Sequence, residues 1–290
     1  MPLKLDVKEE EISKIETKHP SEKYLRRDRL PHIWCPGCGL GAILNAYCHA
    51  LSEEGFGLDD FAVVSGIGCA GRVAGYIASD SYHTTHGRAI PFATGLKLAN
   101  PRMNVTVFSG DGDLFSIGGN HFSHTARRNI DLSVICVNNY TYGMTGGQVG
   151  PTTPQGAKAT TAPYGNFERP FNLPNIAASS GAVYVARWTS LHVRRMKKAF
   201  RKILKKKGFT FVEVLSPCPT GFGRRNDQGE ALDELRSYKK RSVIKEGADP
   251  SEVGIDIDPD SDLIVGTFVD EEKPTYSEVK EARLAKRFNK

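Results

Sequence analysis

The chain has 290 residues, of which 39% are hydrophobic and 25% are charged. This composition excludes a fully disordered chain, because enough apolar side chains are present to bury a sizeable core. No apolar run approaches the ~20 residues that a membrane-spanning helix needs, and the first 28 residues lack the apolar core of a secretory signal peptide. We therefore expect a cytoplasmic protein that does not associate with a membrane.

The net charge of +6 is concentrated in two segments. Residues 191–207 carry nine basic and no acidic side chains, whereas residues 247–272 carry nine acidic and no basic ones. Because the positive charge is not spread along the chain, we expect no nucleic-acid partner. The basic segment also has the apolar spacing of an amphipathic helix, which favours a solvated charged face over a partner site.

The hydrophobic pattern predicts an α/β fold. Four apolar runs predict strands buried on both faces of a parallel sheet. These runs span residues 61–69, 104–110, 131–139 and 209–218. Helices are predicted at residues 39–52, 88–99, 116–128 and 190–207. Alternation of strands and helices indicates a mainly parallel sheet flanked by helices.

Charged segments with weak periodicity flank this region at both ends. We predict an N-terminal arm at residues 1–30, a ligand-binding domain at residues 31–218 and a C-terminal arm at residues 219–290. No internal repeat or low-complexity tract divides the sequence further. The chain is therefore expected to contain one domain with charged terminal arms.

A glycine-rich turn, GDGD at residues 110–113, follows a predicted strand and precedes a helix. Glycines let backbone amides approach a phosphate, and the helix N-terminus favours its negative charge. A carboxylate among those amides suits a Mg²⁺ ion, because Mg²⁺ prefers oxygen ligands. Asn139 follows Asp111 by 28 positions, and a parallel crossover of that length brings the two strand ends together. The alternative is a tight turn whose aspartate caps a helix.

Four of the six cysteines lie at predicted turns or strand ends. These are Cys35, Cys38, Cys69 and Cys218. Cys48 lies inside a predicted helix and Cys136 inside a predicted strand, where cysteines usually act as small hydrophobes. Four thiolates suit either a tetrahedral Zn²⁺ or a [4Fe-4S] cluster, and the isolated third and fourth cysteines favour the cluster.

Together these motifs resemble those of the beta subunits of 2-oxoacid:ferredoxin oxidoreductases, over residues 32–223. GDG followed by NN is similar to the motif that binds thiamine diphosphate (TPP), and NNYTYGMTGGQ follows the family's pattern. The family also carries CPGC, a cysteine in an IGC turn and another in SPC, which this chain matches. The resemblance implies a TPP-binding fold at residues 31–218. It also implies one [4Fe-4S] cluster, bound by Cys35, Cys38, Cys69 and Cys218.

The resemblance also implies individual ligands. Mg²⁺ would be held by Asp111, Asn139 and the backbone carbonyl of Thr141. The diphosphate would accept hydrogen bonds from the backbone amides of Gly112 and Asp113. Further cofactor contacts are implied for Gly68, Cys69, His86, Gly110, Met144 and Thr145.

The implied reaction converts a 2-oxoacid, coenzyme A and oxidised ferredoxin into acyl-CoA, CO₂ and reduced ferredoxin. Arg72 follows Cys69 by three residues, and its planar guanidinium group suits recognition of a second carboxylate. The expected substrate is therefore 2-oxoglutarate. A surface salt bridge is the alternative for Arg72.

The resemblance implies two partners, namely an alpha subunit that supplies the activating glutamate and a ferredoxin that accepts electrons. The expected assembly is a heterodimer or a dimer of heterodimers, active only with the alpha subunit. Two alternatives remain open. One is an enzyme of the same family for pyruvate or branched-chain 2-oxoacids, and the other is a zinc-stabilised binding module without redox activity.

Overall fold

The computed structural model describes residues 19–258 and 260–288; residues 1–18, part of the predicted N-terminal arm, lie outside the described residues. The strands are β1 Phe61–Ser65, β2 Asp80–His83, β3 Asn104–Gly110, β4 Leu132–Asn138, β5 Thr141–Tyr142, β6 Gln148–Val149, β7 Tyr184–Thr189, β8 Phe209–Leu215, β9 Ser242–Ile244 and β10 Leu263–Asp270. The helices are α2 Leu40–Glu53, α3 Val73–Tyr76, α4 Ala89–Ala99, α5 Gly119–Arg127, α6 Leu173–Ser179, α7 Val193–Lys205, α8 Ala231–Arg241 and α9 Tyr276–Phe288. Short helical turns include Ala70–Arg72 and the π-helix Asp113–Ile117.

Eight strands form one sheet in the order β2-β1-β3-β4-β8-β7-β10-β9. All pairs from β2 to β7 are parallel, whereas β10 is antiparallel to β7 and parallel to β9. Parallel neighbours need long crossovers, and α4 and α5 provide them before β3 and β4. The predicted α/β fold with a mainly parallel sheet is confirmed.

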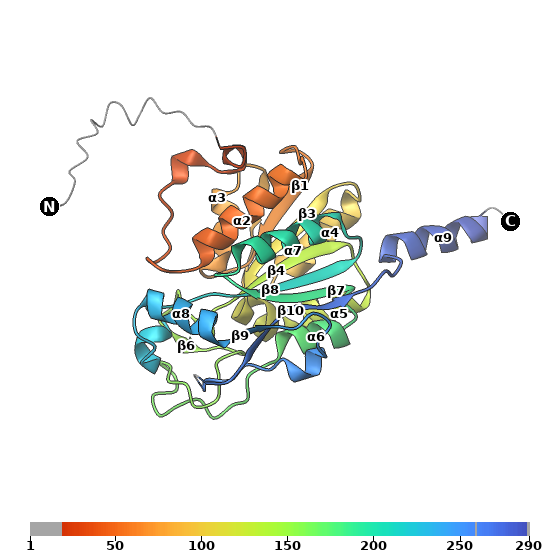
Figure 1. Cartoon of the computed structure of the whole chain (residues 1–290). Coiled ribbons are helices and arrows are strands. Elements are labelled where there is room, and N and C mark those ends of the chain that lie inside the picture. The colour runs from red at the N-terminus through yellow and green to blue at the C-terminus, as the bar shows by residue number, and fades with distance from the viewer. Residues whose placement is uncertain (1–18, 259, 289–290) are drawn as a thin grey trace, which may run out of the picture.

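Helices cover both faces of this sheet (Figure 1). The core on one face includes α2 and α7, and the core on the other includes α4, α5 and α6. Strand β3 is apolar because side chains on both of its faces are buried. Phe108 packs into the core that includes α2 and α7, and Val107 packs into the core on the other face. In the described part of the chain, no helix combines the length and hydrophobicity needed to cross a membrane.

The segment beyond Pro219, which is predicted to be a C-terminal arm, contains regular structure. This segment contributes α8, β9 and β10, and β10 pairs with β7 so that Gly266 lies opposite Arg187. Leu263 and Val265 are buried in the core that includes α2 and α7, so these strands belong to the main layer. Only α9 extends away from the body (Figure 1). The division into three domains stays a prediction.

Candidate active site

A cavity of about 270 Å³ opens at the carboxyl edge of the sheet, in the loops that follow β1, β3 and β4. Strands β3 and β4 pair with Gly110 opposite Val137, so the loops after them begin side by side. Ligands bind at this edge of α/β sheets. All residues predicted to contact Mg²⁺ or the cofactor line the cavity: Gly68, Cys69, His86, Gly110, Asp111, Gly112, Asp113, Asn139, Thr141, Met144 and Thr145.

Asp111 is a buried carboxylate at the base of this cavity, with 2% of its surface exposed. Burial raises its pKa to about 6, while hydrogen bonds from Thr152 and from the backbone amides of Gly112 and Asn139 act in the opposite direction. The Thr152 hydroxyl lies 2.5 Å from Asp111 Oδ2. Removal of a carboxylate from water disfavours its charged form unless a cation or further donors compensate.

The donors beside Asp111 fit a Mg²⁺ ion. The Asn139 side chain and the segment that contains the Thr141 carbonyl line the same cavity, and both provide oxygen donors of the kind that Mg²⁺ prefers. A dication bound there would compensate the buried charge of Asp111. These three residues are therefore chemically suitable, and their roles as ligands stay predictions.

The turn at Gly112 is too crowded for any side chain. A Cβ atom at this position would lie 2.3 Å from Cε1 of Tyr142. Gly110 has no comparable neighbour, since only Val137 O lies near, at 3.8 Å from an ideal Cβ. The helical turn Asp113–Ile117 starts immediately afterwards, so backbone N–H groups at the start of this helical segment are available to a phosphate.

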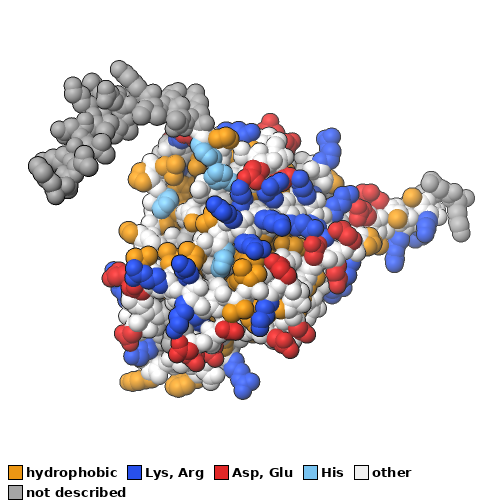
Figure 2. All heavy atoms as spheres, viewed as in Figure 1, with side chains coloured by type: hydrophobic (Ala, Val, Ile, Leu, Met, Phe, Trp, Pro, Cys, Tyr) orange, Lys and Arg blue, Asp and Glu red, His pale blue; other side chains and the backbone are white. Residues whose placement is uncertain are grey.

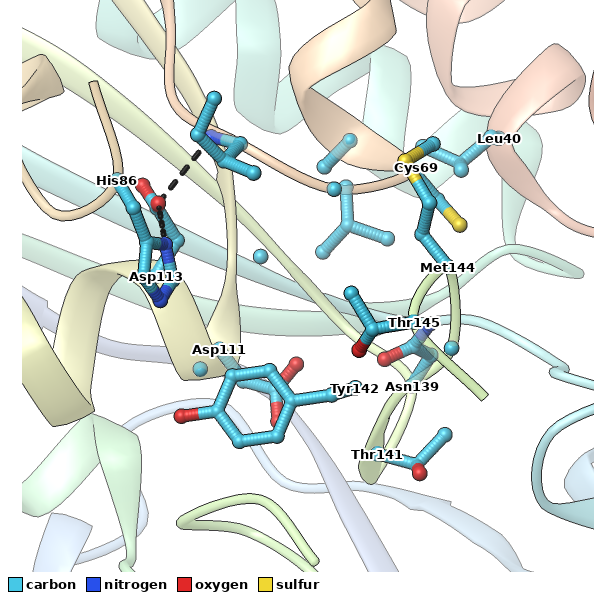
Figure 3. A pocket seen from close by; sticks show the side chains of 17 residues that line it. Leu40, Cys69, His86, Asp111, Asp113, Asn139, Thr141, Tyr142, Met144 and Thr145 are labelled. Carbon is cyan, nitrogen blue, oxygen red and sulfur yellow. Dashed lines mark hydrogen bonds and ion pairs between the residues drawn. The ribbon is translucent and has the colours of Figure 1, made fainter. Parts of the chain in front are cut away.

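The Asp113 side chain joins three loops around the cavity. Its Oδ1 atom accepts hydrogen bonds from the backbone amides of Ile67 and Gly87, at 3.1 and 2.9 Å, and lies 2.5 Å from Nδ1 of His86. Its Oδ2 atom accepts a hydrogen bond from Ser109 Oγ. Figure 3 shows His86 and Asp113 on one side of the cavity and Cys69 on the other. Asp113 therefore fixes where His86 lies.

Sequence reasoning missed seven residues around this cavity. Thr152 contacts Asp111, and the six others line the cavity, namely Leu40, Ile67, Ala70, Val137, Tyr142 and Gly143. Tyr142 belongs to the NNYTYGMTGGQ segment and was open to identification from that motif. Thr152 follows Asp111 by 41 positions in a loop without periodicity, so the sequence carried no signal for it.

Four of the six cysteines also lie close together in the structure, namely Cys35, Cys38, Cys69 and Cys218. An ideal Cβ at Gly143 would lie 3.2 Å from Cys218 Sγ and 3.8 Å from Cys69 Sγ, so both sulfurs lie beside the same backbone position. Burial raises the pKa of Cys38 to about 11, and neighbouring Cys69 and Cys35 add to the increase. Burial likewise raises the pKa of Cys218 to about 12, with additions from Cys69 and Cys38.

Four neighbouring thiols are a donor set suited to a metal group that binds through sulfur. Within residues 19–258 and 260–288, no three His, Cys, Asp or Glu side chains are close enough to hold one metal ion. Thiolates are the usual ligands both of a structural Zn²⁺ and of a [4Fe-4S] cluster. The assignment of these thiols to a cluster therefore stays a prediction.

Arg72 and the two other cysteines lie outside this arrangement. Arg72 ends the short helix Ala70–Arg72, is exposed and does not line the cavity. Its role toward a substrate carboxylate stays a prediction. Cys48 and Cys136 are both fully buried, in the cores on opposite faces of the sheet.

Comparisons with known proteins agree with this geometry. Residues 66–214 match the C-terminal TPP-binding domain of thiamine pyrophosphate enzymes. The 2-oxoglutarate synthase subunit KorB of Methanocaldococcus jannaschii is 51% identical over 90% of this chain and 95% of its own length. The beta subunit of a 2-oxoacid:ferredoxin oxidoreductase from Saccharolobus solfataricus is 42% identical over 75% of this chain and 69% of its own length.

A solved structure extends the likeness to three dimensions. The 2-oxoglutarate:ferredoxin oxidoreductase from Magnetococcus marinus, with 2-oxoglutarate, coenzyme A and succinyl-CoA bound, matches with a TM-score of 0.82 at 32% identity. The match covers 95% of this chain and 92% of that chain. The chain therefore belongs to the beta subunits of the 2-oxoacid:ferredoxin oxidoreductases, a family of oxidoreductases with a TPP-binding domain.

Proposed function

We propose that this beta subunit takes part in the oxidative decarboxylation of 2-oxoglutarate. In this reaction 2-oxoglutarate and coenzyme A yield succinyl-CoA and CO₂, and two electrons pass singly to ferredoxin. The observation that carries the proposal is that one cavity is lined both by the Asp111 turn and by Cys69. A site for carbon chemistry and a site for electron transfer would then adjoin each other.

The residues of the cavity divide the work of holding the cofactor. Asp111, Asn139 and the Thr141 carbonyl would hold Mg²⁺, and the Gly112 and Asp113 amides would bind the diphosphate. The remaining cofactor contacts would come from Gly68, Cys69, His86, Gly110, Met144 and Thr145. Bound TPP supplies the nucleophilic carbon and the electron sink that decarboxylation of a 2-oxoacid requires.

The cysteines would hold one [4Fe-4S] cluster, which supplies a one-electron carrier. The ligands in this proposal are Cys35, Cys38, Cys69 and Cys218. Support comes from the mutual proximity of their thiols. The zinc-stabilised module without redox activity is disfavoured because the relatives are subunits of oxidoreductases.

The choice of 2-oxoglutarate rests on relatives that are named 2-oxoglutarate synthase subunits. Arg72 would pair with the distal carboxylate of this substrate. Its exposed position beside Cys69 requires that the substrate reach it at the outer side of the cavity. A pyruvate or branched-chain enzyme is the second candidate, because other relatives are named for 2-oxoacids in general.

A partner subunit would complete the active site. Among the described residues that line the cavity there is no glutamate, so the glutamate that activates the cofactor in this family would come from the alpha subunit. The names of the relatives support a division of the active site between two subunits, since they are called subunit KorB or subunit beta. We propose a heterodimer or a dimer of heterodimers that passes electrons to a separate ferredoxin.

An anaerobic assay of the chain co-purified with its alpha subunit tests the function. Viologen reduction should depend on coenzyme A and on TPP, and should be faster with 2-oxoglutarate than with pyruvate or branched-chain 2-oxoacids. Preference for one of the other acids would transfer the proposal to the second candidate. A folded complex that contains zinc and no iron, and reduces no viologen, would exclude both.

A further inference from the structure

A buried hydroxyl group supports the carboxylate of Asp111. Thr152 is fully buried, and its Oγ1 atom lies 2.5 Å from Asp111 Oδ2 and 2.9 Å from Asn138 Oδ1. Both of these oxygens are acceptors, and a threonine hydroxyl has one hydrogen to donate. When Asp111 is ionised, the charged and closer oxygen is the better acceptor. The Thr152 hydrogen is then directed at Asp111.

The position of Asn138 is fixed from its other side. Its Oδ1 atom accepts a hydrogen bond of 3.1 Å from the backbone amide of Tyr140, and its Nδ2 donates one of 2.7 Å to Glu213 Oε1. These two bonds determine which way the Asn138 amide points. The Asn138 amide therefore presents only its oxygen to Thr152 and offers no hydrogen that could turn the Thr152 hydroxyl into an acceptor.

This chain of contacts continues to the C-terminal segment. Glu213 Oε2 accepts a hydrogen bond of 2.6 Å from Arg187 Nε, and both side chains are fully buried. Arg187 Nη1 donates to the backbone carbonyl of Val253. Adjacent strands β4, β8 and β7 carry Asn138, Glu213 and Arg187. Buried side chains of the sheet thus fix the orientation of Asn138 beside Thr152.

We propose that Thr152 is a positioning residue that aims Asp111 at the metal ion through the hydrogen bond from its hydroxyl group. The inference rests on the proposed Mg²⁺ and TPP site and adds a determinant of metal affinity to it. A ligating carboxylate whose second oxygen accepts a hydrogen bond has fewer orientations to lose when the ion binds. Loss of the hydroxyl should therefore weaken metal binding beyond its effect on stability.

Three variants of the full chain, each co-purified with the partner subunit, test this inference. Thr152→Val removes the hydroxyl with little change in shape, and Thr152→Ser restores it. Thr153→Val is the matched control, because Thr153 is equally buried and donates to the Tyr140 carbonyl without touching Asp111. Mn²⁺ is titrated in the presence of TPP and free ion is measured by electron paramagnetic resonance, while thermal unfolding reports stability.

Thr152→Val should bind Mn²⁺ about 10- to 100-fold more weakly than the unaltered chain, as is typical when a partner of a metal ligand is lost. Thr152→Ser and Thr153→Val should stay within about twofold of it. Should Thr152→Val not fold, Thr152→Ala is expected to show the same weakening.

Equal affinity in the unaltered chain and Thr152→Val would overturn the inference, as would equal weakening in Thr153→Val, which indicates general damage to the loop. Either result would leave the proposed function intact. An unaltered complex that shows no metal-dependent TPP binding would remove both.

Discussion

Asp111 is the residue on which the proposed metal site depends most directly. Asp111→Ala should abolish Mg²⁺-dependent TPP binding, because it removes the charged oxygen donor; a loss greater than about 100-fold is expected. Calorimetric titration of TPP at fixed Mg²⁺ measures this change. Asp131→Ala is a suitable control, since Asp131 precedes β4 at the opposite edge of the sheet, where it pairs with Lys97. Unchanged TPP affinity in Asp111→Ala would contradict the proposed site.

Arg72 is the side chain proposed to select 2-oxoglutarate over other 2-oxoacids. A charge-assisted hydrogen bond contributes about 1.5–3 kcal/mol, so Arg72→Ala should lower kcat/KM for 2-oxoglutarate by about 10- to 200-fold. Pyruvate has no distal carboxylate, and its kcat/KM should change little. Arg102, which is exposed at the other edge of the sheet, provides the control variant. Parallel losses for both acids would mean that Arg72 has no role in selecting the substrate.

Replacement of Cys48 and replacement of Cys69 are expected to have opposite effects on the iron content. Cys48 is fully buried in the helix α2, so Cys48→Ala should keep about four irons per chain. Cys69→Ala removes a proposed ligand and should lose the cluster absorption near 400 nm. Iron analysis of anaerobically purified protein distinguishes them. Iron loss in Cys48→Ala together with full retention in Cys69→Ala would mean that the ligand set is wrong.

At the scale of elements, helix α7 is basic in sequence but largely neutralised in the folded chain. Lys202 pairs with Asp270 at 3.0 Å, and Arg201 pairs with Glu53 at 3.0 Å. Figure 2 shows acidic side chains among the basic ones on this surface. Exposed ion pairs contribute only about 0–1 kcal/mol each to the free energy of unfolding. The main effect of these pairs is therefore to neutralise charge on the surface. The helix therefore offers less free positive charge than its sequence indicates.

Packing rather than charge stabilises α7 against the sheet. Phe200 is fully buried, and its ring lies 6.2 Å from that of Tyr47 on α2. Phe200→Ala should lower the free energy of unfolding by about 3–5 kcal/mol, because it leaves a cavity between the two helices. Lys198→Ala, on the exposed face of the same helix, should change it by less than about 0.5 kcal/mol. Denaturant unfolding of both variants measures the difference, and similar values would show that charge dominates.

At the scale of the whole molecule, two truncations distinguish an arm from a structural part of the sheet. A chain that ends at Arg241 loses β9 and β10 and exposes the edge of β7, so it should lose cooperative thermal unfolding. A chain that ends at Thr275 loses only α9, whose described side chains are mostly exposed, and its Tm should fall by no more than about 4 °C. Calorimetry of both chains provides the measurement. Cooperative unfolding of the shorter chain would support the prediction that residues 219–290 form an arm.

The strands whose sequences are long apolar runs were predictable, and the strands interrupted by a charged residue or a glycine were not. Long apolar runs identified β1, β3, β4 and β8, because both faces of these strands pack under helices. Strand β7 escaped prediction since the charged Arg187 interrupts it, and that charge is compensated only by Glu213 on the neighbouring strand. Strand β10 is apolar, but it escaped prediction because it lies within an acidic segment and is interrupted by Gly266.

The candidate site divides in the same way. The proximity of Asp111 and Asn139 could be predicted from the sequence. Their spacing matches one parallel crossover, which places the ends of two consecutive strands side by side. The side-chain contacts of Asp113 could not, since they depend on how three separate loops fold around it. Local motifs identify which chemical groups are present, whereas their supporting partners are set by tertiary packing.

The unequal burial of the four neighbouring cysteines has a consequence for life in air. Cys35 is exposed, whereas Cys38, Cys69 and Cys218 are half-buried. A cluster on these thiols would reach the molecular surface at the Cys35 corner, which gives electrons a short way out. Dissolved oxygen would reach the irons by the same corner, because nothing in the described chain covers that thiol. Protection from oxygen would therefore have to come from outside the described residues, for example from a subunit that shields Cys35, or the protein would need a habitat without oxygen.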